Sequence, residues 1–152
     1  MKTMTRYIGL SLLTALFIGT ETMAQDADDW YQNHYAPLWK EKPWDKVEEG
    51  SVHYADTLYL HPPDGAVTAV DSRDWLTKSI AGWKSDGWVG SVVAEYQSDQ
   101  LNQATVAFKV KWRDLYADGS EEFSCGWYVA DLEEERWVFT QYAEIDCAEH
   151  DL

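Results

Sequence analysis

The hydrophobic pattern of the chain changes at Trp88, and this change restricts the possible folds more than any other feature. Before Trp88, apolar residues recur at helical spacing, whereas after it they alternate with polar residues. Helical segments followed by successive strands predict an α+β domain with an antiparallel meander. Turn residues divide the meander into four runs, Val89–Gln97, Ala104–Leu115, Glu121–Ala130 and Trp137–Glu144.

The part before Trp88 contains three predicted helices and a short strand. Each helix has an apolar face at i, i+4 spacing, and each boundary coincides with a proline, a glycine or a capping residue. The predicted elements are a helix over Trp30–Lys42, a second helix from near Trp44 after Pro43, a strand over Thr57–His61, and a third helix from Asp71 or Ser72 to Gly87.

Asp118-Gly119 is a sharp hairpin signal, and a two-residue turn there sets the register of the flanking strands. It places Trp112 opposite Cys125. One sheet face then becomes apolar and must be covered by the helices or enclose a pocket, while the other is wet or forms a partner interface. The apolar face carries Val106, Phe108, Val110, Trp112, Phe123, Cys125, Trp127 and Val129, and the opposite face Lys109, Lys111, Arg113, Glu122, Ser124 and Tyr128.

The first 24 residues have the pattern of a cleaved signal peptide. Lys2 and Arg6 precede an uncharged stretch over residues 7–20, and Ala24 supplies the small residue before cleavage. The stretch is shorter than the about 20 apolar residues that span hydrocarbon. We therefore expect a mature domain over residues 25–152, with its core at about 26–147, that is periplasmic or secreted and keeps no stable membrane anchor.

The net charge argues against nucleic acid as a partner. The chain carries 12 Lys and Arg against 27 Asp and Glu, a formal net charge of −15, which repels phosphate backbones. His34 and His53 have no metal-binding spacing, so we expect neither a metal nor a cofactor.

Cys125 and Cys147 would lie in an oxidising compartment, which favours a disulfide. A second hairpin around residues 132–135, however, pairs Cys125 with Tyr142 and not with Cys147. A C-terminal tail that turns back could still join the two cysteines. A disulfide and two buried or idle thiols therefore both remain open.

Nine tryptophans are more than a core of this size holds comfortably, so we expect several at a pocket or an interface, although core packing accounts for most of them. The candidate ligand-binding side chains come from the apolar sheet face and from the helices that cover it. They are Tyr35, Tyr54, Trp75, Trp83, Phe108, Trp112 and Trp127.

The order and spacing of these elements resemble a known family. The matching residues are Trp44-Asp45-Lys46-Val47, Tyr54-Ala55-Asp56, His61-Pro62-Pro63-Asp64-Gly65, Gly126-Trp127-Tyr128, Arg136-Trp137 and Gln141-Tyr142. Together they resemble the SnoaL-like division of the nuclear transport factor 2-like superfamily, which includes polyketide cyclases and ketosteroid isomerases. The resemblance implies a cone-shaped α+β barrel, three N-terminal helices packed on a curved, mostly antiparallel sheet, with a deep pocket and a homodimer formed through the outer sheet face.

The resemblance does not select a reaction, because the fold hosts several. Pro62 occupies the position of the isomerases' catalytic Asp, and proline cannot accept a proton. A cyclase- or dehydratase-like site could use His61 as acid and base, with Asp56 and Tyr59 as its partners. The alternative is an exposed histidine beside a proline-rich turn.

We therefore predict an exported domain that binds a small, largely apolar or ring-shaped molecule in its cone. One alternative is a lyase, isomerase or cyclase that uses His61. A second alternative is a non-catalytic dimeric structural or assembly domain.

Overall fold

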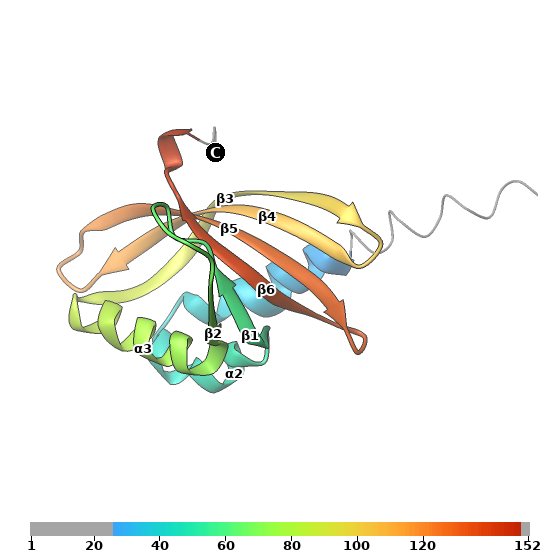
Figure 1. Ribbon diagram of the computed structural model, residues 1–152. Helices are drawn as coiled ribbons and strands as arrows, with labels where there is room; N and C mark the ends of the chain where they lie inside the picture. Colours follow the sequence, from blue (N-terminus) through green and yellow to red (C-terminus); the bar gives the residue numbers. More distant parts are fainter. Residues whose placement is uncertain (1–25, 150–152) are drawn as a thin grey trace, which may run out of the picture.

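The structure of the protein is a computed structural model that describes residues 26–149, so the predicted signal peptide lies outside the described residues. A six-stranded sheet curves over the helical segments (Figure 1). All neighbouring strands are antiparallel except β1 and β6, which are parallel. The predicted α+β class is confirmed. In the order β2-β1-β6-β5-β4-β3, the strands are β2 (Thr68–Asp71), β1 (Tyr54–Leu60), β6 (Arg136–Ile145), β5 (Glu121–Glu133), β4 (Thr105–Tyr116) and β3 (Trp88–Asn102).

β2 is a strand that the sequence pattern did not indicate. It pairs antiparallel with β1, with Val70 opposite Leu58, so the predicted turn at residues 62–65 closes a small hairpin. Three of the four residues of β2 are exposed, which explains why its sequence lacks the alternation of a half-buried strand.

The first helical stretch is irregular because Pro37 lacks a backbone N–H and cannot continue a regular α-helix. Residues 26–30 are α-helical, η1 (Tyr31–Tyr35) is a π turn, and η2 (Ala36–Trp39) is a 3₁₀ helix. The stretch therefore ends before the predicted Lys42. It still buries Tyr31, Tyr35 and Trp39 beneath the sheet.

The helices between residues 43 and 85 lie on the same concave side of the sheet, whereas the short C-terminal helix follows β6 away from them (Figure 1). Asp71 caps the third helix, since its Oδ1 accepts a hydrogen bond of 2.8 Å from the Asp74 N–H, which confirms the predicted cap. Within residues 26–149, every helix falls short of the length and apolar character needed to cross a bilayer. The helices are η3 (Pro43–Asp45), α2 (Val47–Ser51), α3 (Ser72–Ser85) and the C-terminal η4 (Cys147–Glu149).

The register of β4 with β5 differs by one residue from the prediction. The turn uses three residues, 117–119, with Gly119 left-handed at φ 86°, and the Tyr116 N–H donates to the Ser120 carbonyl at 3.0 Å. Trp112 therefore lies opposite Ser124 and not opposite Cys125. A one-residue slip turns every side chain of a strand to the other face. The predicted placement of Phe123, Cys125, Trp127 and Val129 on the same face as Trp112 is wrong, and Ser124, Gly126, Tyr128 and Ala130 lie there instead.

The inward side chains of β4 divide the space beneath the sheet into two parts. Val106, Phe108 and Val110 are fully buried in an aromatic and aliphatic core. Further along the strand, Trp112 and Asp114 line a cavity. The same sheet face thus provides a packed core at one end and a hollow at the other.

Candidate ligand-binding site

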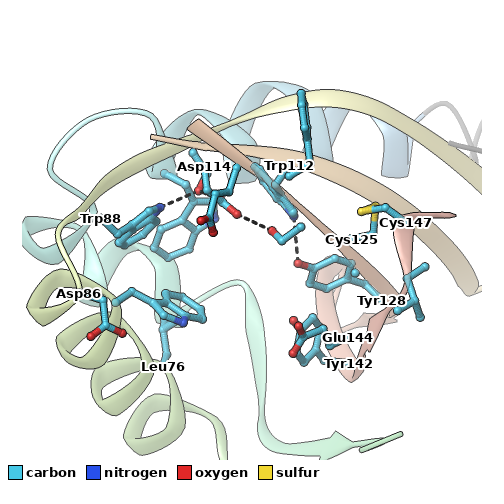
Figure 2. Close-up of a pocket in the computed structure, with 18 of the residues that line it drawn as sticks. Leu76, Asp86, Trp88, Trp112, Asp114, Cys125, Tyr128, Tyr142, Glu144 and Cys147 are labelled. Carbon is cyan, nitrogen blue, oxygen red and sulfur yellow. Dashed lines mark hydrogen bonds between the residues drawn. A yellow bond between two sulfur atoms is a disulfide. The ribbon is translucent and has the colours of Figure 1, made fainter. Parts of the chain in front are cut away.

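A cavity of about 520 Å³ lies between the concave face of the sheet and the helices (Figure 2). Its walls come from α3, from the first residues of β3 and β5, and from the last residues of β4 and β6. They are completed by Tyr35 and Trp39 of the first helical stretch and by Tyr54 of β1. A volume of this size is typical of small-molecule sites. Aromatic side chains are prominent in the lining and include Trp75, Trp83, Trp88, Trp112, Tyr128 and Tyr142.

Aromatic rings form two sides of the cavity. Trp83 at the end of α3 packs edge-on against Trp88 at the start of β3, with ring centroids 5.4 Å apart. Trp75 lies nearer the start of α3. Its ring centroid is 5.6 Å from that of Tyr142 and 5.9 Å from that of Tyr54. These spacings are those of favourable aromatic pairs, so the rings hold one another in place around the hollow.

Hydroxyl groups lie at the inner end of the cavity. The Tyr35 and Tyr54 hydroxyls share a buried hydrogen bond of 2.6 Å, and the Trp112 Nε1–H donates to the Tyr128 hydroxyl at 3.1 Å. Burial raises the pKa of Tyr35, Tyr54 and Tyr128 well above the ordinary value. These tyrosines are therefore neutral near pH 7 and serve as hydrogen-bonding groups, not as bases.

Asp114 is held by a hydrogen-bonded chain along one wall (Figure 2). The Trp88 Nε1–H donates to Ser91 Oγ at 2.9 Å, and the Ser91 hydroxyl donates to Asp114 Oδ1. Ser124, which faces inward because of the shifted register, donates to Asp114 Oδ2 at 2.6 Å. Both carboxylate oxygens are thus fixed by hydroxyl donors in the cavity wall.

The indole N–H of Trp39 is a buried donor with weak hydrogen bonding. It acts on the Tyr35 hydroxyl, yet its Nε1 makes no hydrogen bond of normal geometry within the described part of the chain, although the side chain lines the cavity and is 6% exposed. Gly50 lies against the outer side of the same ring, where a Cβ would overlap the indole. A ligand with an acceptor atom at this point would satisfy a donor that is otherwise costly to bury.

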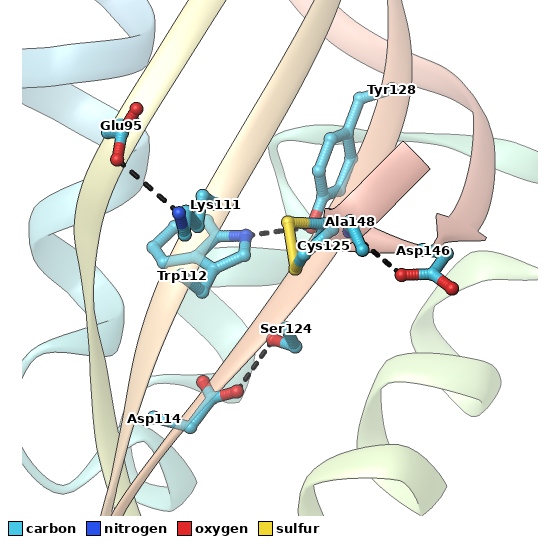
Figure 3. Close-up of a disulfide and its surroundings, with 10 residues drawn as sticks. Glu95, Lys111, Trp112, Asp114, Ser124, Cys125, Tyr128, Asp146 and Ala148 are labelled. Atoms are coloured by element: carbon cyan, nitrogen blue, oxygen red, sulfur yellow. Dashed lines mark hydrogen bonds and ion pairs between the residues drawn. A yellow bond between two sulfur atoms is a disulfide. The ribbon is translucent and has the colours of Figure 1, made fainter. Parts of the chain in front are cut away.

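The structure joins Cys125 and Cys147 in a disulfide, with a Cα–Cα distance of 5.3 Å (Figure 3). The predicted pairing of Cys125 with Tyr142 is wrong. The β5–β6 turn falls at Glu134 and Glu135, and a bulge follows, so Cys125 lies opposite Ile145. Cys147 then comes two residues later, close enough to bond. The disulfide fastens the C-terminal turn beside the cavity that both cysteines line.

The structure brings most of the predicted ligand-binding residues together. Phe108 does not line the cavity but is fully buried in the core, stacked on Tyr31 at 4.9 Å. Trp127 points to the outer sheet face because of the register shift and contacts the His61 ring at 5.9 Å. Both were predicted at the pocket, and both predictions are wrong. The five predicted residues that do line the cavity are Tyr35, Tyr54, Trp75, Trp83 and Trp112. Ligand binding by them stays a prediction.

The three residues proposed for catalysis lie outside this cavity. His61 Nε2 is 2.9 Å from Gln141 Oε1, and its ring packs against Trp127 on the outer face. Asp56 and Tyr59 line a separate, polar depression. His61 follows β1 and lies on the convex side of the sheet. The fold therefore does not group His61, Asp56 and Tyr59 around one pocket, as was predicted.

The sequence reasoning missed several lining residues, and one of them had a readable signal. Asp114 follows Trp112 by two positions, so the alternation of β4 alone places its carboxylate on the apolar face. Tyr128 could be placed in the cavity only with the correct β4–β5 register. Trp88 lies where the hydrophobic period changes from helix to strand, so neither period assigned its side chain to a face. Within residues 26–149, no group of three or more His, Cys, Asp or Glu side chains is arranged to hold a metal ion.

Comparison with known proteins identifies the architecture. No protein-family model and no curated protein matches the sequence. An NTF-2 like protein of unknown function from Shewanella oneidensis MR-1 superposes with a TM-score of 0.59 at 15% identity, over 80% of this chain and 99% of that one. An NTF2-like protein with a cystatin-like fold from Novosphingobium aromaticivorans has a TM-score of 0.59 at 11% identity, over 82% of each chain.

This chain has the NTF2-like, cystatin-like fold. The association domain of C. elegans CaMKII has it too, with a TM-score of 0.59 at 11% identity over 84% of this chain and 98% of that one. At these identities the likeness concerns the NTF2-like fold alone. The finer resemblance to the SnoaL-like division stays a prediction.

Proposed function

We propose that this chain is an exported NTF2-like domain that binds a small, largely apolar, ring-shaped molecule in the cavity beneath its sheet. The observation that carries the proposal is the hollow of about 520 Å³ with aromatic walls. A fold that needed only a packed core could fill this space with side chains, as it does around Phe108, where Trp30, Tyr31 and Phe139 pack against the ring. The rings at the hollow are instead held by one another and leave their inner surfaces free for a ligand.

Polar groups at fixed positions support binding of a ligand in one orientation. The hydroxyls of Tyr35, Tyr54 and Tyr128 lie at the inner end, and the weakly hydrogen-bonded Trp39 N–H lines the same space. Sites for small molecules combine such a few placed polar groups with a mostly apolar lining. Because the tyrosine hydroxyls are buried and hydrogen-bonded to neighbours, little ordering of these groups is needed on binding.

Binding can be tested with the mature protein and a panel of mono- and bicyclic aromatic compounds, by calorimetry and by quenching of tryptophan fluorescence. Trp75→Ala removes a cavity wall and should weaken binding at least about tenfold, equivalent to about 1.4 kcal/mol. Trp127→Ala is the matched control, since it makes the same change on the outer face, and should alter affinity less than about twofold. Equal weakening by the two variants, or no binding of any compound by the folded protein, would refute the proposal.

Export is supported by two independent features. The first 24 residues have the charge and hydrophobicity pattern of a signal peptide, and the disulfide between Cys125 and Cys147 suits an oxidising compartment. Expression of the full chain in a Gram-negative host should yield periplasmic or secreted protein whose N-terminus is Gln25. Intact full-length protein in the cytoplasm would contradict this part of the proposal.

We also propose that two copies of the chain pair through the outer sheet face. Trp127 lies on this face, and Phe123 is 58% exposed beneath the Lys111 ammonium, which is 5.4 Å from its ring centroid. A structural neighbour is itself named an association domain. Light scattering should give a dimeric mass for the mature protein and a monomeric mass for Phe123→Glu. A monomeric mass for the unmodified protein would exclude this pairing.

The catalytic alternative finds less support. His61 would have to reach a ligand inside the cone, and it lies on the opposite side of the sheet. The binding function is therefore the one that the geometry supports best.

A further inference from the structure

Carboxylates surround the wider part of the cavity. Asp86 ends α3, Asp114 and Glu122 lie on neighbouring strands, Glu144 lies near the end of β6, and Asp146 follows it; all five line the cavity. Among the lining residues that the structure describes there is no lysine, arginine or histidine. Figure 2 shows Asp86, Asp114 and Glu144 on three different sides of the hollow. The field inside is therefore negative.

The pairing of the strands makes this arrangement unfavourable for the empty protein. Asp114 lies directly opposite Glu122 in the β4–β5 ladder, so both side chains leave the same face of the sheet. Like charges in directly opposed positions destabilise a sheet. Glu144, opposite Gly126, lies on that face as well.

Within the described residues, the carboxylates that line the cavity form no ion pair with a basic side chain. The ion pairs of residues 26–149 use other acidic side chains, such as Glu95 with Lys111 and Glu121 with Arg113. The second of these is informative, because Glu121 is the neighbour of Glu122 but points to the outer face, where Arg113 lies. The basic side chains of β4 therefore compensate acids outside the cavity, and the inner acids remain.

Two tyrosines show that the carboxylates act on a common space. The pKa of Tyr142 is raised first by burial and then by the charges of Glu144 and Asp114. The pKa of Tyr116 is raised by burial and by Glu122, Asp114 and Asp86. Asp114 acts on both tyrosines, and it lines the cavity opposite Glu122 in the β4–β5 ladder. The hydroxyls of Ser91 and Ser124 fix its carboxylate, so its charge is already in position before a ligand enters.

Aromatic rings stand beside these charges. The face of an indole or phenol ring attracts a cation, and this attraction adds to that of a nearby carboxylate. The Trp83–Trp88 pair and the Trp75–Tyr142 pair line the same cavity as Asp114. The walls thus offer what an organic ammonium group requires and repel carboxylates and phosphates.

We propose that the cavity selects a ring-bearing organic cation, an amine or a quaternary ammonium compound, with Asp114 as the fixed anionic contact. The inference rests on the proposed function, since it names the chemical class of the molecule that the cavity binds. The aromatic walls bind the ring, and the carboxylates of Asp114, Glu122 and Glu144 bind the positive charge. The opposed charges of Asp114 and Glu122 are relieved when the cation enters.

Three probes with the same naphthalene ring separate charge from shape: naphthylmethylammonium, naphthylmethanol and naphthoate. Calorimetry on the mature protein at pH 7 and low salt should show the ammonium binding at least about tenfold more tightly than the alcohol, with naphthoate weakest. Asp114→Asn should remove most of the ammonium's advantage and change the affinity for the alcohol less than about twofold. Asp99→Asn, an exposed position on β3 that does not line the cavity, should leave all three affinities unchanged.

The outcomes distinguish this inference from the function on which it rests. Equal binding of ammonium and alcohol refutes the cation preference and leaves cavity binding intact, whereas binding of none of the probes refutes both. Tightest binding of naphthoate, or calcium ions bound in place of the ammonium, refutes the inference as well. Should circular dichroism show that Asp114→Asn is unfolded, Glu122→Gln at an exposed position provides the same test, with weaker ammonium binding expected.

Discussion

The alkaline stability of this protein should depend on its buried tyrosines. Four of them are at most 7% exposed, and burial raises the pKa of each well above the ordinary value. Tyr142 shifts in the same direction. In the unfolded chain these hydroxyls ionise at about pH 10, whereas in the folded protein they remain neutral. The four are Tyr31, Tyr35, Tyr54 and Tyr128.

The sign and size of the effect follow from proton linkage. Because the folded-state pKa lies above the unfolded value, the stabilisation is fully present below about pH 10 and is lost as the pH rises beyond it. At pH 11, ionisation of one unfolded tyrosine lowers the free energy of unfolding by about 1.4 kcal/mol. Four buried tyrosines together lower it by about 6 kcal/mol, which is comparable to the whole stability of a typical domain.

Urea unfolding followed by far-ultraviolet circular dichroism at pH 8 to 11 measures this loss, and absorbance at 295 nm counts the tyrosinates formed. Tyr35→Phe should lower stability at pH 8 by about 1–3 kcal/mol, because it leaves the buried Tyr54 hydroxyl without its partner. It should also make the loss between pH 8 and pH 11 smaller by about 1.4 kcal/mol. Tyr59→Phe, at a side chain 47% exposed, is the matched control and should change neither quantity.

Two results would refute this reasoning. One is a urea midpoint that stays constant from pH 9 to pH 11. The other is ionisation of all the tyrosines near pH 10 while the circular dichroism spectrum of the folded protein is retained. Either would mean that the hydroxyls are not buried as the structure describes.

Three further changes test the framework around the cavity. Replacing Cys125 and Cys147 by Ser opens a loop with a sequence separation of 22 and should cost about 3 kcal/mol in urea unfolding; a reductant should reproduce the loss in the unmodified protein and leave the double variant unaffected. Gly50→Ala would press on the Trp39 ring, so we expect a loss of about 1–3 kcal/mol and weaker ligand binding, and unchanged calorimetry would contradict the contact. Asp71→Ala should cost about 1 kcal/mol by removing the α3 cap, with Asp71→Asn near the original melting temperature.

Features that depend on local sequence could be predicted without coordinates. The α+β class, the meander and the cap of α3 follow from periodicity and from single capping residues, which act over a few positions. The face of β4 was also readable, since its large apolar residues Val106, Phe108, Val110 and Trp112 all have the same parity. This is why the predicted cavity residues on the helices and on β4 near Trp112 lie where they were expected.

The errors arise where a strand has apolar residues of both parities. In β5, Phe123 and Trp127 alternate with Tyr128 and Ala130, so hydrophobicity alone does not decide which set faces inward. Only the turn decides, and a loop of three residues instead of two reverses the outcome. The one extra loop residue turns the Trp127 indole away from the cavity. It also lets Ser124 donate a hydrogen bond to Asp114 and places the Tyr128 hydroxyl at the inner end of the cavity.

The same dependence explains why the chemical character of the cavity was missed. With the predicted register, Glu122 faces outward beside the basic side chains of β4, and Asp114 lies opposite Phe123 on the inner face. With the observed register, Glu122 joins Asp114 inside, and Arg113 lies outside with Phe123 opposite it. A one-residue difference in a turn thus adds a second carboxylate opposite Asp114 and brings Ser124 and Tyr128 to the inner face in place of Phe123 and Trp127. The effect of Glu122→Gln on ammonium binding therefore tests this register in solution, because the substitution weakens binding only if the Glu122 side chain faces the cavity.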